Sequence, residues 1–189
     1  MQLLRQTFYF LRHGETEWNR RGLIQGRVNM PLNGTGLAQA RAARELLAGA
    51  GIATICTSPL DRARLTAEII AAGLHVPVRE IANLGECRFG TCEGQPKGPW
   101  YDAWRRGETP PGAEKFALFL ERALEGLNEA LAAPGPVLIV AHGGIYWAIE
   151  RFAGIARRDR VPNGVPLFHA PPPKPLLPWR RQQLAGFAA

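Results

Sequence analysis

The sequence lacks the features that would place it in a membrane or in a disulfide-rich class. It has no run of 18 apolar residues, which argues against a membrane span. Residues 1–7 contain no apolar segment followed by a small-residue cleavage site, so we expect no signal peptide and a cytoplasmic protein. Cysteine is scarce: Cys56, Cys87 and Cys92 are odd in number and lack zinc-knuckle spacing, which argues against disulfides and a cysteine-held metal.

Lysine is also scarce, whereas arginine is abundant. Only three of the 23 basic residues are lysine, and with 16 acidic residues the formal net charge is +7. The arginines are dispersed in short pairs such as Arg20-Arg21, and no basic stripe is interleaved with aromatic side chains. This balance suits anionic small molecules, and we expect neither a nucleic-acid nor a membrane partner.

Strand-like and helix-like segments alternate along the chain. Apolar runs predict strands at 7–11, 52–57, 76–80, 136–141 and 165–169. Periodic segments between them predict helices at about 35–50, 59–72, 114–132 and 144–152. This alternation indicates an α/β fold, in which a mostly parallel central sheet lies between two layers of helices.

The composition indicates one domain over residues 1–170, followed by a proline-rich tail at 171–189. Within the domain, residues 83–115 are irregular, rich in Gly and Pro, and are expected to cover the substrate site. In the tail, Pro175-x-x-Pro178-x-Arg180 fits a polyproline ligand pattern. Alternatively, the tail packs on the domain or on the partner in a homodimer.

Two of the predicted strands end at a histidine. Arg12-His13 follows the first strand, His142 follows the strand at 136–141, and Arg62 lies one turn into the helix after the second strand. Parallel α/β sheets place ligand sites at such strand ends. Arginines beside these histidines would repel a metal cation. A guanidinium group instead binds two oxygens of one phosphoryl group with two parallel hydrogen bonds. The pattern therefore predicts a pocket for a phosphate group without a metal.

The motifs, taken in order, resemble the histidine phosphatase superfamily, also called the phosphoglycerate mutase-like family. The matching segments extend from residue 7 to about 150, and they are Arg12–Asn19, Gln25-Gly26, Pro31–Asn33, Gly36–Ala40, Ser58–Ala63, Leu84–Glu86 and Ala141–Gly144. Arg-His-Gly alone would be a weak signal, but the ordered set is specific.

The resemblance implies a role for each matching residue. His13 would be the nucleophile that forms a phosphohistidine, and Glu86 would protonate the leaving oxygen. The phosphoryl oxygens would be held by Arg12, Arg62 and His142. The rest of the substrate would be contacted by Asn19, Gln25, Gly26, Gly143, Arg105 and Arg106. No metal or other cofactor is implied, because the arginines supply the positive charge.

The segment after Glu86 bears on the choice between a phosphatase and a mutase. Phe89-Gly90 followed by Glu93-Gly94 resembles the phosphatase branch, and the stretch up to the helix at Glu114 is shorter than in mutases. A short cover protects a phosphorylated intermediate poorly from water. These features favour a histidine acid-type phosphatase, a metal-independent phosphomonoester hydrolase acting on a small phosphorylated metabolite.

Two alternatives stay open. Lys97 and Trp104-Arg105-Arg106 resemble substrate-binding residues of the mutase branch, which leaves a cofactor-dependent phosphoglycerate mutase possible. A non-catalytic phosphate-binding or scaffold protein on the same fold is the other alternative. The chain also departs from the family pattern at Asn29, where an aspartate is usual, and at Ala113–Lys115, where Gly-Glu-Ser is usual.

Overall fold

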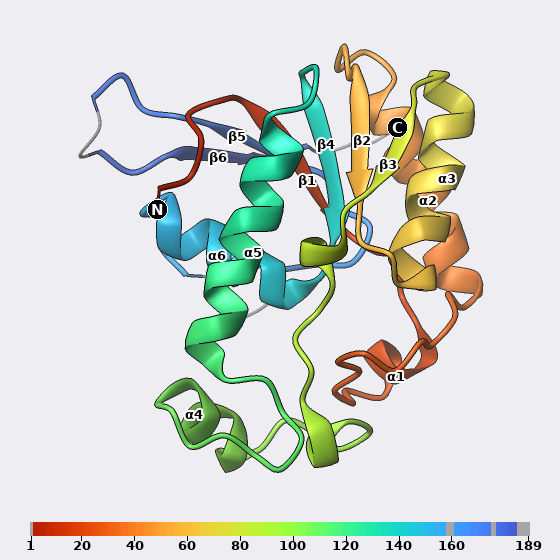
Figure 1. The fold of residues 1–189 in the computed structure, drawn as a ribbon. Helices are drawn as coiled ribbons and strands as arrows, with labels where there is room; N and C mark the ends of the chain where they lie inside the picture. The colour runs from red at the N-terminus through yellow and green to blue at the C-terminus, as the bar shows by residue number, and fades with distance from the viewer. Residues whose placement is uncertain (1, 158–160, 175–176, 185–189) are drawn as a thin grey trace.

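The computed structural model describes residues 2–157, 161–174 and 177–184. Within these ranges, six strands form one sheet in the order β3-β2-β4-β1-β5-β6 (Figure 1). The strands are β1 (Phe8–Arg12), β2 (Thr54–Thr57), β3 (Val78–Glu80), β4 (Val137–Ala141), β5 (Leu167–Ala170) and β6 (Arg180–Gln183). The first four strands in the order are parallel, whereas β5 is antiparallel to β1 and β6 is antiparallel to β5. The predicted α/β class with a mostly parallel sheet is confirmed.

Helices cover both faces of this sheet. The α-helices are α1 (Glu17–Arg20), α2 (Gly34–Leu47), α3 (Asp61–Leu74), α4 (Pro99–Arg105), α5 (Phe116–Leu131) and α6 (Gly143–Phe152). In Figure 1, α2 and α3 lie on one face of the sheet and α5 and α6 on the other. No helix in the described ranges is long and apolar enough to cross a membrane.

The strands bury both of their faces, which explains their continuous apolar sequences. All five residues of β4 are buried. Because side chains alternate along a strand, Leu138 and Val140 pack with Leu47 in one hydrophobic core, whereas Ile139 packs with Leu127 in the other. The sheet is therefore the middle layer of three.

The parallel strands β1, β2 and β4 end at the same edge of the sheet and deliver three polar residues there. His13 follows β1, Ser58 follows β2 and His142 follows β4. Helices α1 and α4 lie beyond this edge (Figure 1). The segment at 83–115, which includes α4, thus lies beyond the strand ends.

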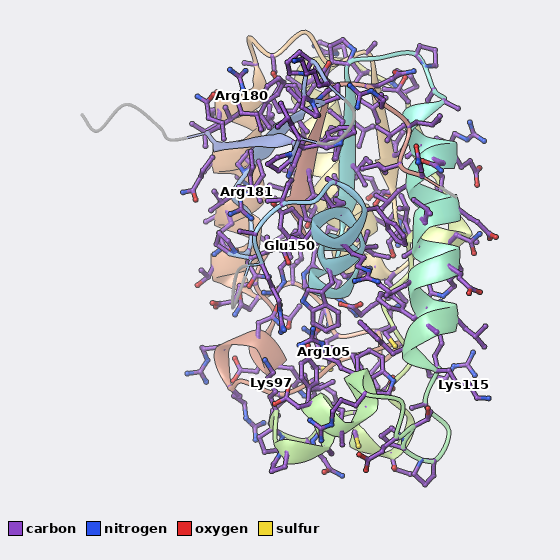
Figure 2. The ribbon with its side chains drawn as sticks, turned by 90° about the vertical axis from the view of Figure 1, so that its left-hand side faces the viewer. Lys97, Arg105, Lys115, Glu150, Arg180 and Arg181 are labelled. Carbon is purple, nitrogen blue, oxygen red and sulfur yellow. The ribbon has the colours of Figure 1, made fainter. Side chains whose placement is uncertain are left out.

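The described part of the tail packs on the domain. Strand β6 extends the sheet, and Trp179 is 8% exposed and packs edge-on against Phe8. Arg181 Nη1 lies 3.4 Å from the buried Glu150 carboxylate on α6 (Figure 2). The boundary predicted at residue 170 therefore marks a change of composition rather than of fold. Pro175 of the polyproline pattern lies outside the described residues.

Candidate active site

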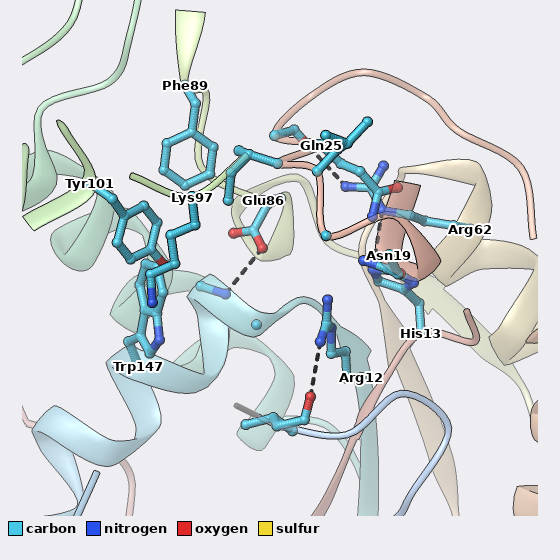
Figure 3. Close-up of a pocket in the computed structure, with 17 residues that line it drawn as sticks. Arg12, His13, Asn19, Gln25, Arg62, Glu86, Phe89, Lys97, Tyr101 and Trp147 are labelled. Atoms are coloured by element: carbon cyan, nitrogen blue, oxygen red, sulfur yellow. Dashed lines mark hydrogen bonds between the residues drawn. The ribbon is translucent and has the colours of Figure 1, made fainter. Parts of the chain in front are cut away.

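A cavity of about 300 Å³ opens at the strand ends, and the residues lining it are shown in Figure 3. It lies between the turn after β1, the loop at 19–26, the start of α6 and the 83–115 segment. Arg12, His13, Arg62 and Glu86 all line it. The structure thus brings four of the five residues predicted to be catalytic to one cavity. The fifth, His142, does not line the cavity, but its ring centroid lies 5.2 Å from that of His13.

Two hydrogen bonds define the His13 imidazole. Its Nδ1 lies 2.7 Å from the Gly14 carbonyl oxygen, so Nδ1 carries the proton and donates it. Its Nε2 lies 3.2 Å from Nε of Arg62, whose N–H donates to the lone pair (Figure 3). The ring is 2% exposed. The structure therefore holds a neutral imidazole with an Nε2 lone pair directed at a guanidinium.

Arg62 is held by the loop that precedes α2. Its Nη1 donates to the Val28 carbonyl and its Nη2 to the Gly26 carbonyl, both at 2.8 Å. Burial lowers the pKa of the guanidinium to about 10, so it remains charged at neutral pH. Arg12 reaches the cavity from the other side, where its Nη1 donates to the Val161 carbonyl at 2.9 Å. Two positive charges therefore face the same space.

His142 is oriented by Ser58. Helix α3 begins at Asp61, and the Ser58 hydroxyl lies 2.7 Å from His142 Nε2. Both residues are fully buried. His142 Nδ1 is also buried and has no hydrogen-bond partner among the described residues. The hydrogen bond to Ser58 thus fixes the orientation of the ring through its Nε2.

In Figure 3 the Glu86 carboxylate lies between Arg62 and the rings of Phe89 and Tyr101. It accepts the backbone N–H of Cys87 at 2.8 Å and that of Gly144 at 3.1 Å. A Cβ added to Gly144 would lie 2.1 Å from Glu86 Oε1, so only glycine leaves room for this carboxylate. The second glycine of the motif after β4 is therefore explained by the position of Glu86.

Arg122, a residue of α5, holds the main chain at Glu86 by hydrogen bonds. Arg122 donates to the carbonyls of Gly85 and Glu86 and forms an ion pair with Glu114, with 2.6 Å between Nε and Oε1. Glu114 thus has a structural role in the segment that departs from the family pattern. At the other departure, the Asn29 amide donates to the Asp61 carboxylate and its oxygen accepts the Asp61 N–H. An aspartate at position 29 would place two carboxylates together.

Two of the six residues predicted to contact substrate are outside the cavity, and this is a correction. Arg105 Nη1 lies 4.0 Å from Asp102, and its guanidinium carbon lies 5.8 Å from the Phe116 ring centroid. Arg106 is exposed and faces Glu108. The four others line the cavity: Asn19, Gln25, Gly26 and Gly143. In the Trp-Arg-Arg pattern, Trp104 is buried in α4 and neither arginine lines the cavity.

The family model described as the histidine phosphatase superfamily (branch 1) matches residues 8–159 of this chain. The chain belongs to this superfamily. Every strand end and glycine turn described above lies within the matched range.

The chain is similar to proteins named as phosphatases and to proteins named as phosphoglycerate mutases. The uncharacterized phosphatase PhoE of Bacillus subtilis is 39% identical over 143 residues, which cover 74% of this chain and 72% of that protein. The probable phosphoglycerate mutase GpmB of Serratia proteamaculans is 35% identical over 148 residues, covering 71% and 68%. A mycobacterial glucosyl-3-phosphoglycerate phosphatase, solved with VO3, has a TM-score of 0.79 at 25% identity and coverage of 95% and 98%. The relatives therefore include both phosphatases and mutases.

The cavity has an aromatic side that the sequence did not predict. Phe89, Tyr101 and Trp147 line it, together with Lys97, which the sequence indicated only through its resemblance to mutases. Trp147 follows Gly143 by four residues and so lies on the same face of α6, a spacing that could have identified it. Lys97 and Tyr101 come from the irregular segment, where no periodic pattern indicates which side chains point inward.

The two buried histidines of the site, His13 and His142, should make folding sensitive to acid. Burial first, and then the charge of Arg62, lower the pKa values of His13 and His142 well below 6.5. The unfolded chain takes up protons at about pH 6.5, whereas the folded chain does not. The stabilisation is therefore complete above about pH 6.5, and the free energy of unfolding falls below it by up to about 1.4 kcal/mol per pH unit for each imidazole.

Urea unfolding between pH 5 and pH 8 measures this effect. The pH dependence should be weaker in His142→Gln and unchanged in His75→Asn, which replaces an exposed imidazole at a left-handed position that asparagine tolerates. An unchanged dependence in His142→Gln would contradict the assignment of a buried neutral imidazole.

Proposed function

We propose that this protein hydrolyses phosphomonoesters of small metabolites through a phosphohistidine at His13, without a metal or other cofactor. The observation that carries the proposal is the neutral His13 ring in the cavity wall, with its proton on Nδ1 and its Nε2 lone pair directed at the Arg62 guanidinium, which lines the same cavity. A neutral imidazole held in one tautomer by an acceptor is a competent nucleophile. Arg12 and Arg62 supply the charge that a phosphoryl group requires.

In the first step, Nε2 of His13 attacks phosphorus and the bond from phosphorus to the ester oxygen breaks. The leaving oxygen takes a proton from the Glu86 carboxyl group, so that a neutral alcohol departs. Arg12, Arg62 and Nδ1 of His142 contact the phosphoryl oxygens. The Gly14 carbonyl accepts a hydrogen bond from Nδ1–H throughout, and this bond stabilises the positive charge that the ring acquires.

In the second step, water attacks phosphorus on the side that the alcohol has left. The Glu86 carboxylate accepts a proton from this water, and the bond from phosphorus to Nε2 breaks. Inorganic phosphate leaves, Glu86 is again protonated and His13 is again neutral. The same carboxyl group thus acts as acid and then as base.

Two observations favour hydrolysis over mutase activity. The arginine pair that resembles the mutase pattern lies outside the cavity, and Phe89 offers no hydroxyl where mutases have a tyrosine. Lys97 lines the cavity and is the observation that keeps the mutase as the second candidate. A scaffold protein would need neither the His13 tautomer nor the backbone bonds that hold Glu86.

Product analysis separates these functions. We expect inorganic phosphate to be released from a phosphomonoester at the same rate with and without a chelator. With 3-phosphoglycerate and 2,3-bisphosphoglycerate present, phosphate should accumulate and 2-phosphoglycerate should not. Loss of activity with the chelator contradicts the metal-free mechanism, isomer formation establishes the mutase, and no turnover supports the scaffold.

Replacing Ser58 by alanine should lower kcat by roughly 10- to 100-fold, the range for residues that orient a functional group through a hydrogen bond. The substitution leaves Nε2 of His142 buried without its partner at 2.7 Å, so the ring can turn away from the phosphoryl oxygens. Ser58→Thr keeps the hydroxyl and should retain more activity. Thr57→Val is the matched control, because it removes a neighbouring buried hydroxyl that bonds only to backbone carbonyls. Equal kcat values for Ser58→Ala and Thr57→Val would contradict this role.

A further inference from the structure

The cavity divides into two halves of different chemistry. One half carries the charged groups of Arg12, His13 and Arg62. The other half, which we name the aromatic subsite, is lined by Phe89, Lys97, Tyr101 and Trp147 (Figure 3). Glu86 lies between the halves in Figure 3, at the place proposed for the ester oxygen. The substituent that follows this oxygen therefore enters the aromatic subsite.

The rings of the aromatic subsite are fixed by their neighbours. Phe89 and Tyr101 are 3% and 4% exposed, and Phe89 packs edge-on against the fully buried Trp104 with 5.0 Å between centroids. Tyr101 packs edge-on against Trp147 at 5.5 Å. The subsite is thus formed before any ligand arrives, and a ligand that fits it pays little ordering cost.

Trp147 is the ring best placed to stack on a ligand. Lys97 Nζ lies over the Tyr101 ring, 4.4 Å from its centroid, and so covers one face of that ring. Trp147 is only half-buried, and it follows Gly143 by four residues, about 6 Å along α6. An indole at that distance from the phosphate end meets the first flat group beyond the ester oxygen.

The same half offers few partners for hydroxyl groups. Among its described lining residues, Lys97 is the one charged side chain and Tyr101 carries the one hydroxyl. Burying a hydroxyl without a hydrogen-bond partner is unfavourable. A sugar or glycerate group would bury several hydroxyls here, whereas a flat apolar group would bury none.

We propose that the aromatic subsite selects phosphomonoesters whose alcohol carries a flat, apolar group, and that Trp147 is the residue that stacks on it. This inference rests on the proposed hydrolysis of phosphomonoesters. It assigns Trp147 to specificity rather than to bond cleavage.

Esters with similar leaving groups test the inference. Phenylethyl phosphate and glycerol 3-phosphate both release a primary alcohol, so the ratio of their kcat/KM values reports recognition rather than reactivity. We expect this ratio to be at least about tenfold in favour of phenylethyl phosphate, the size of discrimination that one apolar contact or stacked ring supplies. A ratio of one or below overturns the proposal.

Variants of two tryptophans assign the effect. In Trp147→Ala the ratio should fall about tenfold, and Trp147→Leu, which keeps apolar volume, should also lower it. Trp179→Leu is the matched control for Trp147→Leu, because Trp179 packs on Phe8 at 6.0 Å and does not line the cavity. Its ratio should be that of the unchanged protein. A ratio that Trp147→Ala and Trp147→Leu leave unchanged overturns the role of Trp147.

A binding measurement separates failure of the subsite from failure of the proposed function. If neither ester is hydrolysed, the proposed function fails, and calorimetry with phenylethylphosphonate and ethylphosphonate still tests the subsite. The phenyl compound should bind at least about tenfold more tightly. Equal dissociation constants overturn the aromatic subsite whatever the activity.

Discussion

Replacing His13 by alanine should lower kcat for phosphomonoester hydrolysis by roughly 10⁴- to 10⁶-fold, the loss seen when a covalent nucleophile is removed. No other nitrogen replaces Nε2, because the second histidine is held by Ser58 at 2.7 Å. Water would have to attack the ester directly, with only the arginines to stabilise the transition state. Phosphate release under single-turnover conditions measures this loss.

The covalent intermediate gives the prediction a second readout. A bond between phosphorus and an imidazole nitrogen survives in base and hydrolyses in acid. When the substrate carries a label on its phosphoryl group, quenching with base should therefore trap the parent protein with the labelled phosphoryl group attached. His13→Ala should carry no label, whereas His75→Asn should be labelled like the parent. Retained label or retained turnover in His13→Ala would show that another group is the nucleophile.

Much of the fold could be predicted because strong local patterns agree with the tertiary structure. The run at 136–141 is apolar throughout because β4 is buried on both faces. The shorter strand β6 could not be predicted. Arg180–Gln183 is polar and mostly exposed, and it is ordered by pairing with β5 and by the burial of Trp179. Long-range pairing of this kind leaves no periodic signal in the segment itself.

The site residues likewise divide into those that a local sequence pattern predicts and those whose position depends on tertiary packing. His13 and His142 could be placed because each directly follows a strand, and strand ends converge by topology. Arg105 was misplaced because its position depends on the direction in which α4 packs, within a segment that has no regular pattern. Arg122 was missed for a different reason. It looks like a surface residue of an amphipathic helix until the carbonyls of Gly85 and Glu86 are found beside it.

Replacing Arg62 by methionine should have the second largest effect, a loss in kcat/KM of about 10³- to 10⁵-fold, the value of an arginine that stabilises phosphoryl transfer. Methionine keeps most of the apolar volume but removes the charge and all three hydrogen bonds. Arg62→Lys should lose nearly as much. A single ammonium cannot reach the carbonyls of Gly26 and Val28 and the Nε2 atom of His13 at once. Arg64→Lys, an exposed arginine on the same helix, is the matched control and should stay within about twofold.

The pH profile shows whether Arg62 acts on His13 or only holds the loop. Its charge is the second cause, after burial, that lowers the pKa of His13. Removing that charge raises the pKa of the imidazole, so the neutral nucleophile is lost at a higher pH as acid is added. The acidic limb of kcat/KM should therefore shift to higher pH in Arg62→Met and much less in Arg62→Lys, which keeps a positive charge. A residue that only fixed the loop would lower the whole profile without moving this limb, and that outcome would contradict a direct electrostatic role for Arg62.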